Sequence, residues 1–200
     1  MELSFILFAS FGVFVFGVSK GGFPGPVAML AVPVMSFVMS PIQAAAILLP
    51  LLIIMDCIAM YIYWNKWKIN FLKIIIPASI IGIIIGSLTF QYTSENQIRI
   101  VVGTISILFV IFSFIKKNNF LLKPTKLKGY FWSTTAGYTS FLIHAGGPPI
   151  NFYLLPLKLD KSSYLGTITL SFFIINAVKL IPYYNLNLFV PTNLKLSLIF

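Results

Sequence analysis

The sequence predicts an all-α polytopic membrane protein, and three observations carry that prediction. Of the 200 residues, 58% are hydrophobic and only 9% are charged, whereas soluble domains are about a quarter charged. The apolar residues gather in runs, several of which approach the ~20 residues that a helix needs to cross a bilayer. Short Gly- and Pro-rich passages interrupt these runs, which is typical of broken helices at membrane depth.

The apolar segments differ in length, and the difference indicates which of them can cross the bilayer. Segments 42–64 and 162–184 are long enough to span it. Segments 27–39 and 149–157 are too short to cross alone, so we expect half-helices or re-entrant pieces there. Segments 74–90 and 98–115 are adequate spans. The remaining apolar segments are 3–19, 129–145 and 194 to the end.

The net charge of +10 arises from 14 Lys and Arg residues against four acids. Most of the lysines stand in short loops between apolar segments, where the positive-inside rule explains them. We therefore expect no nucleic-acid partner. With the lysine-rich loops in the cytoplasm, the topology alternates across the cell membrane and the N-terminus falls outside. These lysines are Lys66, Lys68, Lys73, Lys116, Lys117, Lys123, Lys126, Lys128, Lys158 and Lys161.

A shift of 123 residues aligns two halves of the chain, laying Pro26 on Pro149 and Pro33 on Pro156. Both halves share the order of small and Pro residues, a short apolar piece, a long helix and aromatics. Each unit makes an odd number of crossings, so the second must be inverted. We expect one integral membrane domain with a first repeat at 1–122, a broken hairpin plus three helices, and a second at 123–200. The second repeat is expected to be incomplete at the C-terminus, because Phe200 corresponds to Pro77.

Two ionisable residues lie deep inside apolar spans, where a charge costs a few kcal/mol or more and is a functional candidate by default. Asp56 lies in 42–64, and Lys179 lies at the equivalent depth of 162–184. We expect them to face one central cavity and to form a charge pair that couples transport. Two alternatives stay open. Asp56 could form a buried ion pair or hydrogen bond that only holds two helices together, and Lys179 could extend its long side chain to the membrane interface.

Each Gly- and Pro-rich break carries a group suited to binding an anion. Helices that begin after a break present free N–H groups and a positive dipole end; Lys20 stands at the first break and His144 at the second. His144 could donate to an anion or relay a proton, or be a satisfied core residue. Asn176 shares a face with Lys179 and either lines the cavity or bonds a neighbouring helix. The residues expected to hold substrate are Lys20, Gly21, Gly22, His144, Gly146, Gly147 and Asn176.

These motifs together resemble the sulfite exporter TauE/SafE family of membrane transporters. The resemblance covers the whole chain and implies export or uptake of small, often sulfur-containing anions by two related halves. Pro24 and Pro26 depart from the family's glycine-rich first break. The matching stretches are Ser19–Phe23 with Gly25, Ala31–Pro33, Pro41–Pro50 with Met55-Asp56, His144–Pro149, Leu155-Pro156, Asn176 with Lys179, and Pro182-Tyr183.

The resulting hypothesis is a secondary transporter that moves a small, sulfite- or sulfonate-like anion across the cytoplasmic membrane by alternating access. A passive anion or weak-acid channel and a non-catalytic membrane subunit stay open as alternatives. One His and scattered acids do not make a metal-ligand set, so neither a metal nor a cofactor is expected. An enzyme is not expected, since no nucleophile–base pair appears. The expected partners are a small anionic solute and the lipid bilayer, with a homo-oligomer left open.

Overall fold

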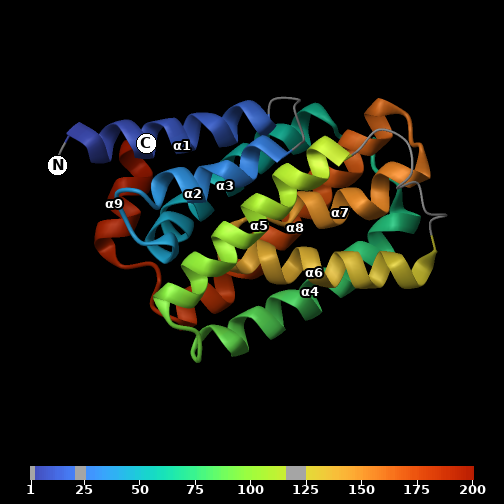
Figure 1. The fold of residues 1–200 in the computed structure, drawn as a ribbon. Helices are drawn as coiled ribbons and strands as arrows, with labels where there is room; N and C mark the ends of the chain where they lie inside the picture. The colour runs from blue at the N-terminus through green and yellow to red at the C-terminus, as the bar shows by residue number, and fades with distance from the viewer. Residues whose placement is uncertain (1–2, 21–25, 116–124) are drawn as a thin grey trace.

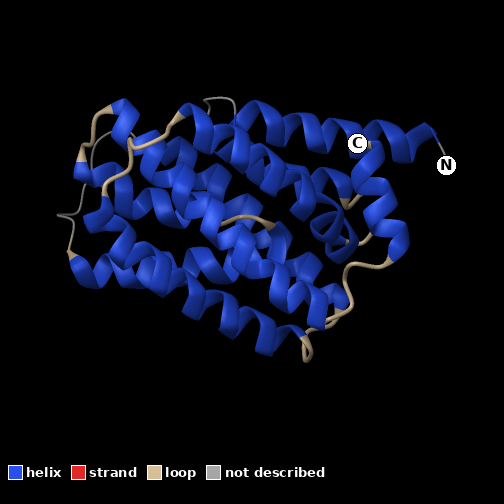
Figure 2. Cartoon of the chain, turned by 180° about the vertical axis from the view of Figure 1, so that it is seen from behind, coloured by secondary structure: helices blue, strands red, loops and turns tan. Residues whose placement is uncertain are grey.

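The computed structural model describes residues 3–20, 26–115 and 125–200, which form helices joined by short turns and contain no strand (Figure 1, Figure 2). The long helices lie side by side in one bundle (Figure 1). In chain order the elements are α1 Leu3–Lys20, η1 Pro26–Leu30, α2 Ala31–Met35, α3 Pro41–Ile62, α4 Ile69–Phe90, α5 Glu95–Ile115, α6 Lys126–Ile143, α7 Gly147–Leu154, η2 Leu155–Leu157, α8 Lys161–Asn185 and α9 Pro191–Ile199.

The helix bounds confirm the prediction of an all-α membrane protein. Within the described residues, α1, α3, α4 and α8 are long and apolar enough to cross a membrane. The two passages predicted to be too short are indeed short: η1 with α2 covers 26–35, and α7 with η2 covers 147–157. At about 1.5–2 Å of rise per residue, neither piece reaches across ~30 Å of hydrocarbon.

Local sequence fixes where the long helices begin and end. Ser40 caps α3, its hydroxyl accepting from the Gln43 N–H at 3.1 Å, and Pro41 occupies the first turn, where no N–H is needed. Asp160 caps α8 in the same way through the Ser163 N–H at 3.0 Å. His144 ends α6 in the left-handed conformation, with φ 56° and ψ 23°, which turns the chain sharply into α7.

Helices α4 and α6 pack closely along their length, and small residues make that approach feasible. A Cβ built on Gly82 would lie 2.0 Å from the Thr134 carbonyl oxygen, and one on Gly137 would lie 2.0 Å from the Ser79 carbonyl oxygen. The Ser79 hydroxyl donates to the Ser133 carbonyl oxygen across the pair at 3.0 Å. The two backbones therefore touch at Gly82 and Gly137, where there is no room for a larger side chain.

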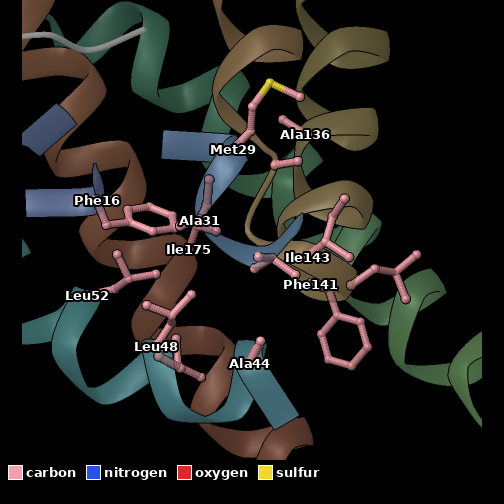
Figure 3. Packing of buried hydrophobic residues seen from close by; sticks show 14 of the residues in the cluster. Phe16, Met29, Ala31, Ala44, Leu48, Leu52, Ala136, Phe141, Ile143 and Ile175 are labelled. Atoms are coloured by element: carbon pink, nitrogen blue, oxygen red, sulfur yellow. The ribbon is translucent and has the colours of Figure 1, made fainter. Parts of the chain in front are cut away.

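A buried apolar core joins α1, α3 and α8 in the middle of the bundle. Figure 3 shows Phe16 of α1, Leu48 and Leu52 of α3 and Ile175 of α8 pointing toward one another. The outer faces of the bundle, in contrast, carry large apolar side chains that are exposed, as expected of helices surrounded by lipid. On α3 and α4 these include Ile54, Ile58, Ile62, Ile81, Ile84 and Leu88.

The element bounds follow the 123-residue shift. Applied to α1, the shift reproduces the limits of α6 at both ends, and applied to α3 it reproduces the last residue of α8. In Figure 1, α1 runs away from the end that carries the N-terminus, whereas α6 runs toward that end; α3 and α8 also run in opposite directions. These relations support the predicted inverted repeats at 1–122 and 123–200, which remain a prediction.

The two ends of the bundle differ in charge. The connections from α3 to α4 and from η2 to α8 lie at the end opposite the N-terminus (Figure 1). They contain three lysines, Lys66, Lys68 and Lys158, and one acid, Asp160. The connections from α4 to α5 and from α8 to α9, at the N-terminal end, contain no charged residue. We refer to the first of these as the lysine-rich end.

Candidate functional site

A cavity of about 70 Å³ lies between α1, α3, α6, α7 and α8. Its wall is mostly apolar, with a few polar groups directed into it, as is usual for small-ligand sites. Tyr63 at the end of α3 and Leu165 near the start of α8 line it toward the lysine-rich end. Its full lining is Phe16, Ser19, Lys20, Ala28, Leu52, Tyr63, Ser140, His144, Gly147, Asn151, Leu165, Ile168, Thr169, Phe172 and Asn176.

The cavity is closed toward the N-terminal end. Ile47 and Leu48 lie on α3 beyond the lining residue Leu52, and Tyr183 lies on α8 beyond Asn176. All three are at most 1% exposed. The Tyr183 hydroxyl donates to the Phe141 carbonyl oxygen at 2.7 Å, which joins α8 to α6. A solute in the cavity is therefore separated from the N-terminal end by packed side chains.

The first polar cluster of the site contains an ion pair between Lys20 and Asp56. Lys20 is the last residue of α1, and its ammonium bonds Oδ1 of Asp56, a side chain of α3 that is fully buried. The second carboxylate oxygen, Oδ2, accepts from Asn176 Nδ2 at 2.6 Å. The Lys20 ammonium also lies 5.0 Å from the centre of the Phe172 ring, within cation–π range. The Asp56 carboxylate thus has a donor on each oxygen.

The second polar cluster contains Lys179, which is 0% exposed on α8. Its ammonium donates to the Ser140 carbonyl oxygen at 3.0 Å, to the Ser140 hydroxyl at 3.1 Å and to His144 Nδ1 at 2.7 Å. These three acceptors match the three N–H donors of a lysine ammonium. An ammonium at Lys179 is therefore fully hydrogen-bonded, and within the described residues no carboxylate touches it.

The hydrogen bonds of His144 define its tautomer. Nε2 lies 2.9 Å from the Ala45 carbonyl oxygen, which can only accept, so this nitrogen carries the hydrogen. Nδ1 then has a free lone pair, which accepts from Lys179. The neutral ring packs edge-on against Phe16, with 6.2 Å between the ring centres. His144 thus connects the cavity wall to the buried Lys179.

The predicted site residues separate into groups. Lys20, His144, Gly147 and Asn176 line the cavity together. Gly146 does not line it: a Cβ there would lie 2.8 Å from the Ala136 carbonyl oxygen, so this glycine allows close packing. Gly21 and Gly22 lie outside the described residues.

The predicted direct pair of Asp56 with Lys179 is wrong for this conformation. Asp56 bonds Lys20 and Asn176 instead, because α1 ends beside it and Asn176, one turn before Lys179, occupies its second oxygen. Lys179 turns to α6 and His144. Because its side chain is 0% exposed, snorkelling to the interface is also wrong for Lys179.

Ser140 and Phe172 are two residues of the site that sequence reasoning missed. Ser140 stands four residues before His144 on α6, so a helical-face argument could have found it. Phe172 stands one turn before Asn176 on α8, so the same helical-face argument applies to it. An aromatic residue in an apolar span is too common, however, for this signal to have singled it out.

The features described so far define a class of protein. A helical membrane bundle with two interrupted segments and a cavity at those interruptions, lined by charged groups, is typical of a secondary transporter. The family model described as "Sulfite exporter TauE/SafE" matches residues 9–200. The chain therefore belongs to the sulfite exporter TauE/SafE family. Comparisons with curated proteins and with solved structures gave no match.

Proposed function

We propose that this protein is a secondary transporter that carries a small, sulfur-containing anion of the sulfite or sulfonate type across the cytoplasmic membrane by alternating access. The observation that carries the proposal is the meeting of Lys20 and His144 at one cavity. They stand next to the two breaks, far apart in sequence, and Asn176 supplies an amide donor between them.

The charges around the cavity favour an anion over a cation or a neutral solute. Lys20 and Asp56 neutralise each other, and a protonated Lys179 adds a positive charge that no carboxylate of the described residues contacts. An uncompensated charge at membrane depth is costly, and an opposite charge in the cavity lowers that cost. The site with a protonated Lys179 therefore carries one net positive charge, which a monoanion would balance.

The size of the cavity favours a small substrate. A buried water needs roughly 10–15 Å³ of cavity volume, so a cavity of about 70 Å³ accommodates about five to seven water-sized groups. Sulfite has four non-hydrogen atoms and methanesulfonate has five. Larger organic anions would need a wider opening of the wall.

The charge difference between the two ends supports an orientation for the proposed transport. We place the lysine-rich end in the cytoplasm and the N-terminus outside, following the positive-inside rule. The cavity reaches toward the lysine-rich end and is closed toward the other, so this conformation corresponds to an inward-facing state. Alternating access would then open the packing of Ile47, Leu48 and Tyr183.

A transport screen tests the substrate class. Proteoliposomes containing the protein would be offered sulfite, thiosulfate, methanesulfonate and acetate, and we expect uptake of at least one sulfur oxyanion. Lys20→Ala and His144→Ala should each reduce that uptake about tenfold or more, since each removes a polar group from the wall. Lys195→Ala, at an exposed lysine of α9, is the matched control and should transport as the wild type does.

Two results of that screen would contradict the proposal. Wild-type rates in both cavity variants, with correct insertion, would remove the site assignment. Uptake that never exceeds the level set by the substrate's own gradient, even with an imposed proton gradient, would indicate a channel rather than a coupled carrier.

A further inference from the structure

We propose that Lys179 and His144 together form the site of the coupling proton, and that one proton moves with each singly charged anion. This inference rests on the proposed function and adds the coupling ion and its residues. The two side chains share a hydrogen bond of 2.7 Å between Lys179 Nζ and His144 Nδ1. Lys179 is fully buried, whereas His144 borders the cavity, so the pair connects a buried charge with a solute compartment.

In the charged form of the pair, every polar hydrogen has a hydrogen-bond acceptor. Three N–H groups of the Lys179 ammonium meet the Ser140 carbonyl oxygen, the Ser140 hydroxyl oxygen and His144 Nδ1. His144 stays neutral, with its one hydrogen on Nε2 bonded to the Ala45 carbonyl oxygen. The pair therefore holds one proton more than two neutral bases would.

The neutral form can be satisfied by the same neighbours. When the ammonium releases a proton, by way of the His144 ring to cavity water as hydronium, Lys179 keeps two N–H groups and gains a lone pair. One N–H still donates to His144 Nδ1 and the other to the Ser140 carbonyl oxygen. The Ser140 hydroxyl, which can donate as well as accept, rotates to donate to the new lone pair. The pair thus has two states that differ by one proton and need no backbone movement.

Asp56 and Lys20 are less suited to carry the exchangeable proton. Both carboxylate oxygens of Asp56 accept hydrogen bonds, from Lys20 and from Asn176, so a proton added to Asp56 would displace one of these donors. Lys20 in turn has the Asp56 carboxylate as its ion-pair partner. Among the described residues Lys179 has no carboxylate partner, so its charge can be removed without leaving another charge in the cluster unpaired.

The remaining ionisable groups near the pair do not compete for the proton. Tyr183 of α8 and Tyr138 of α6 are phenols, and the Tyr183 hydroxyl donates its hydrogen to the Phe141 carbonyl oxygen. Lys73 of α4 and Lys195 of α9 are exposed. Lys20 and Asp56 form the neighbouring cluster. The helices packed around Lys179 and His144 also carry Cys57, Tyr61, Lys126, Lys128, Tyr130, Tyr153, Lys161, Tyr164 and Tyr184.

The charge balance links the proton to the anion. With the pair protonated, Lys20, Asp56 and Lys179 sum to one positive charge; with the pair deprotonated, they sum to zero. A closed cavity is therefore neutral in two forms, one empty and deprotonated, the other holding one proton and one monoanion. Forms with a net charge are disfavoured at membrane depth, so proton and anion cross together.

Methanesulfonate is the best probe, because it keeps its single negative charge over the working pH range. In wild-type proteoliposomes, an inward methanesulfonate gradient should acidify the lumen, one proton per anion, whether or not the membrane potential is clamped. Lys179→Arg fixes the charge, since arginine does not lose its proton. This variant should keep methanesulfonate exchange and lose net proton-coupled uptake about tenfold or more. Lys195→Arg, at an exposed position, should behave as the wild type in both assays.

The outcomes separate the two proposals. Absence of exchange for both methanesulfonate and sulfite in the wild type would overturn the proposed function, and the coupling with it. Exchange without luminal acidification would overturn the coupling alone. Net proton-coupled uptake by Lys179→Arg at the wild-type rate would overturn the assignment to Lys179 and His144.

A titration of the wild type decides the question if Lys179→Arg does not fold. Because anion and proton bind together, reciprocal linkage requires methanesulfonate affinity to fall about tenfold per pH unit above the midpoint of proton release. An affinity that is constant from pH 5 to pH 9 would overturn the proposal.

Discussion

Two regions of this bundle hold helices together by opposite means. Along α4 and α6 the contact is made by backbone and small residues, with Gly82 and Gly137 each facing a carbonyl oxygen of the other helix. Around the cavity, α1, α3, α6 and α8 are joined by buried charged and amide groups. The first region needs no charge and has no space for one. The second holds charges at membrane depth, where they are costly.

The comparison indicates where stability and function reside. Close small-residue packing gains its energy from van der Waals contact along the whole interface and has no alternative arrangement. A hydrogen-bonded charge cluster contributes less net stability, because the burial of each ion offsets much of the attraction. It can, however, change its partners or its protonation. We therefore expect the two regions to respond differently to substitution.

The largest expected effect is on the α4–α6 contact. Gly82→Ala places a methyl group 2.0 Å from a backbone oxygen that cannot rotate away, so we expect destabilisation of about 3 kcal/mol or more. Thermal unfolding in detergent, followed by tryptophan fluorescence, measures this. Gly103→Ala in α5, where an added Cβ meets nothing within 4 Å, should unfold as the wild type does. Equal midpoints for the two variants would contradict the close contact.

The next effect tests the cavity cluster. Asp56→Leu leaves the Lys20 ammonium and the Asn176 amide without their acceptor, and removal of one partner from a buried pair costs about 3 kcal/mol. Lys20→Met introduced into the Asp56→Leu background should recover part of that loss, because it removes the orphaned charge. A double-mutant cycle on the unfolding midpoints measures the coupling. Strictly additive losses would show that Lys20 and Asp56 do not interact.

The smallest effect concerns the closed end of the cavity. Tyr183→Phe removes the hydroxyl that donates to the Phe141 carbonyl oxygen at 2.7 Å, and a single hydrogen bond contributes about 1 kcal/mol. Tyr184→Phe is the matched control, because that neighbouring side chain is 75% exposed. We expect a lowered midpoint for the first variant alone; a similar shift in both would contradict the role of this bond in closing the cavity.

Much of the fold could be predicted from the sequence, because hydropathy and Pro or Gly breaks act locally. The long segment 42–64 became α3 within two residues at each end, and both short passages remained short. The sequence also predicted that Lys20 and His144 line the cavity. A polar group within an apolar segment is costly in contact with lipid, so it is expected to face the interior of the bundle.

Pairing inside the site could not be predicted in the same way. Asp56 and Lys179 occupy equivalent depths, but depth does not fix the rotation of each helix about its axis. That rotation directs Lys179 to Ser140 and His144 and leaves Asp56 to Lys20. Gly146 and Gly147 illustrate the same limit, since two adjacent glycines have opposite surroundings, one packed and one open.

The central claim is that the cavity lined by Lys20 and His144 binds the transported anion, and equilibrium binding of radiolabelled sulfite to the purified protein tests it most directly. Lys20→Ala removes a positive group from the wall and leaves the Asp56 carboxylate unpaired, so both changes oppose an anion. We predict sulfite binding at least about tenfold weaker in Lys20→Ala, with wild-type affinity in Lys195→Ala. Equal sulfite affinity in the wild type and a folded Lys20→Ala variant would contradict the account.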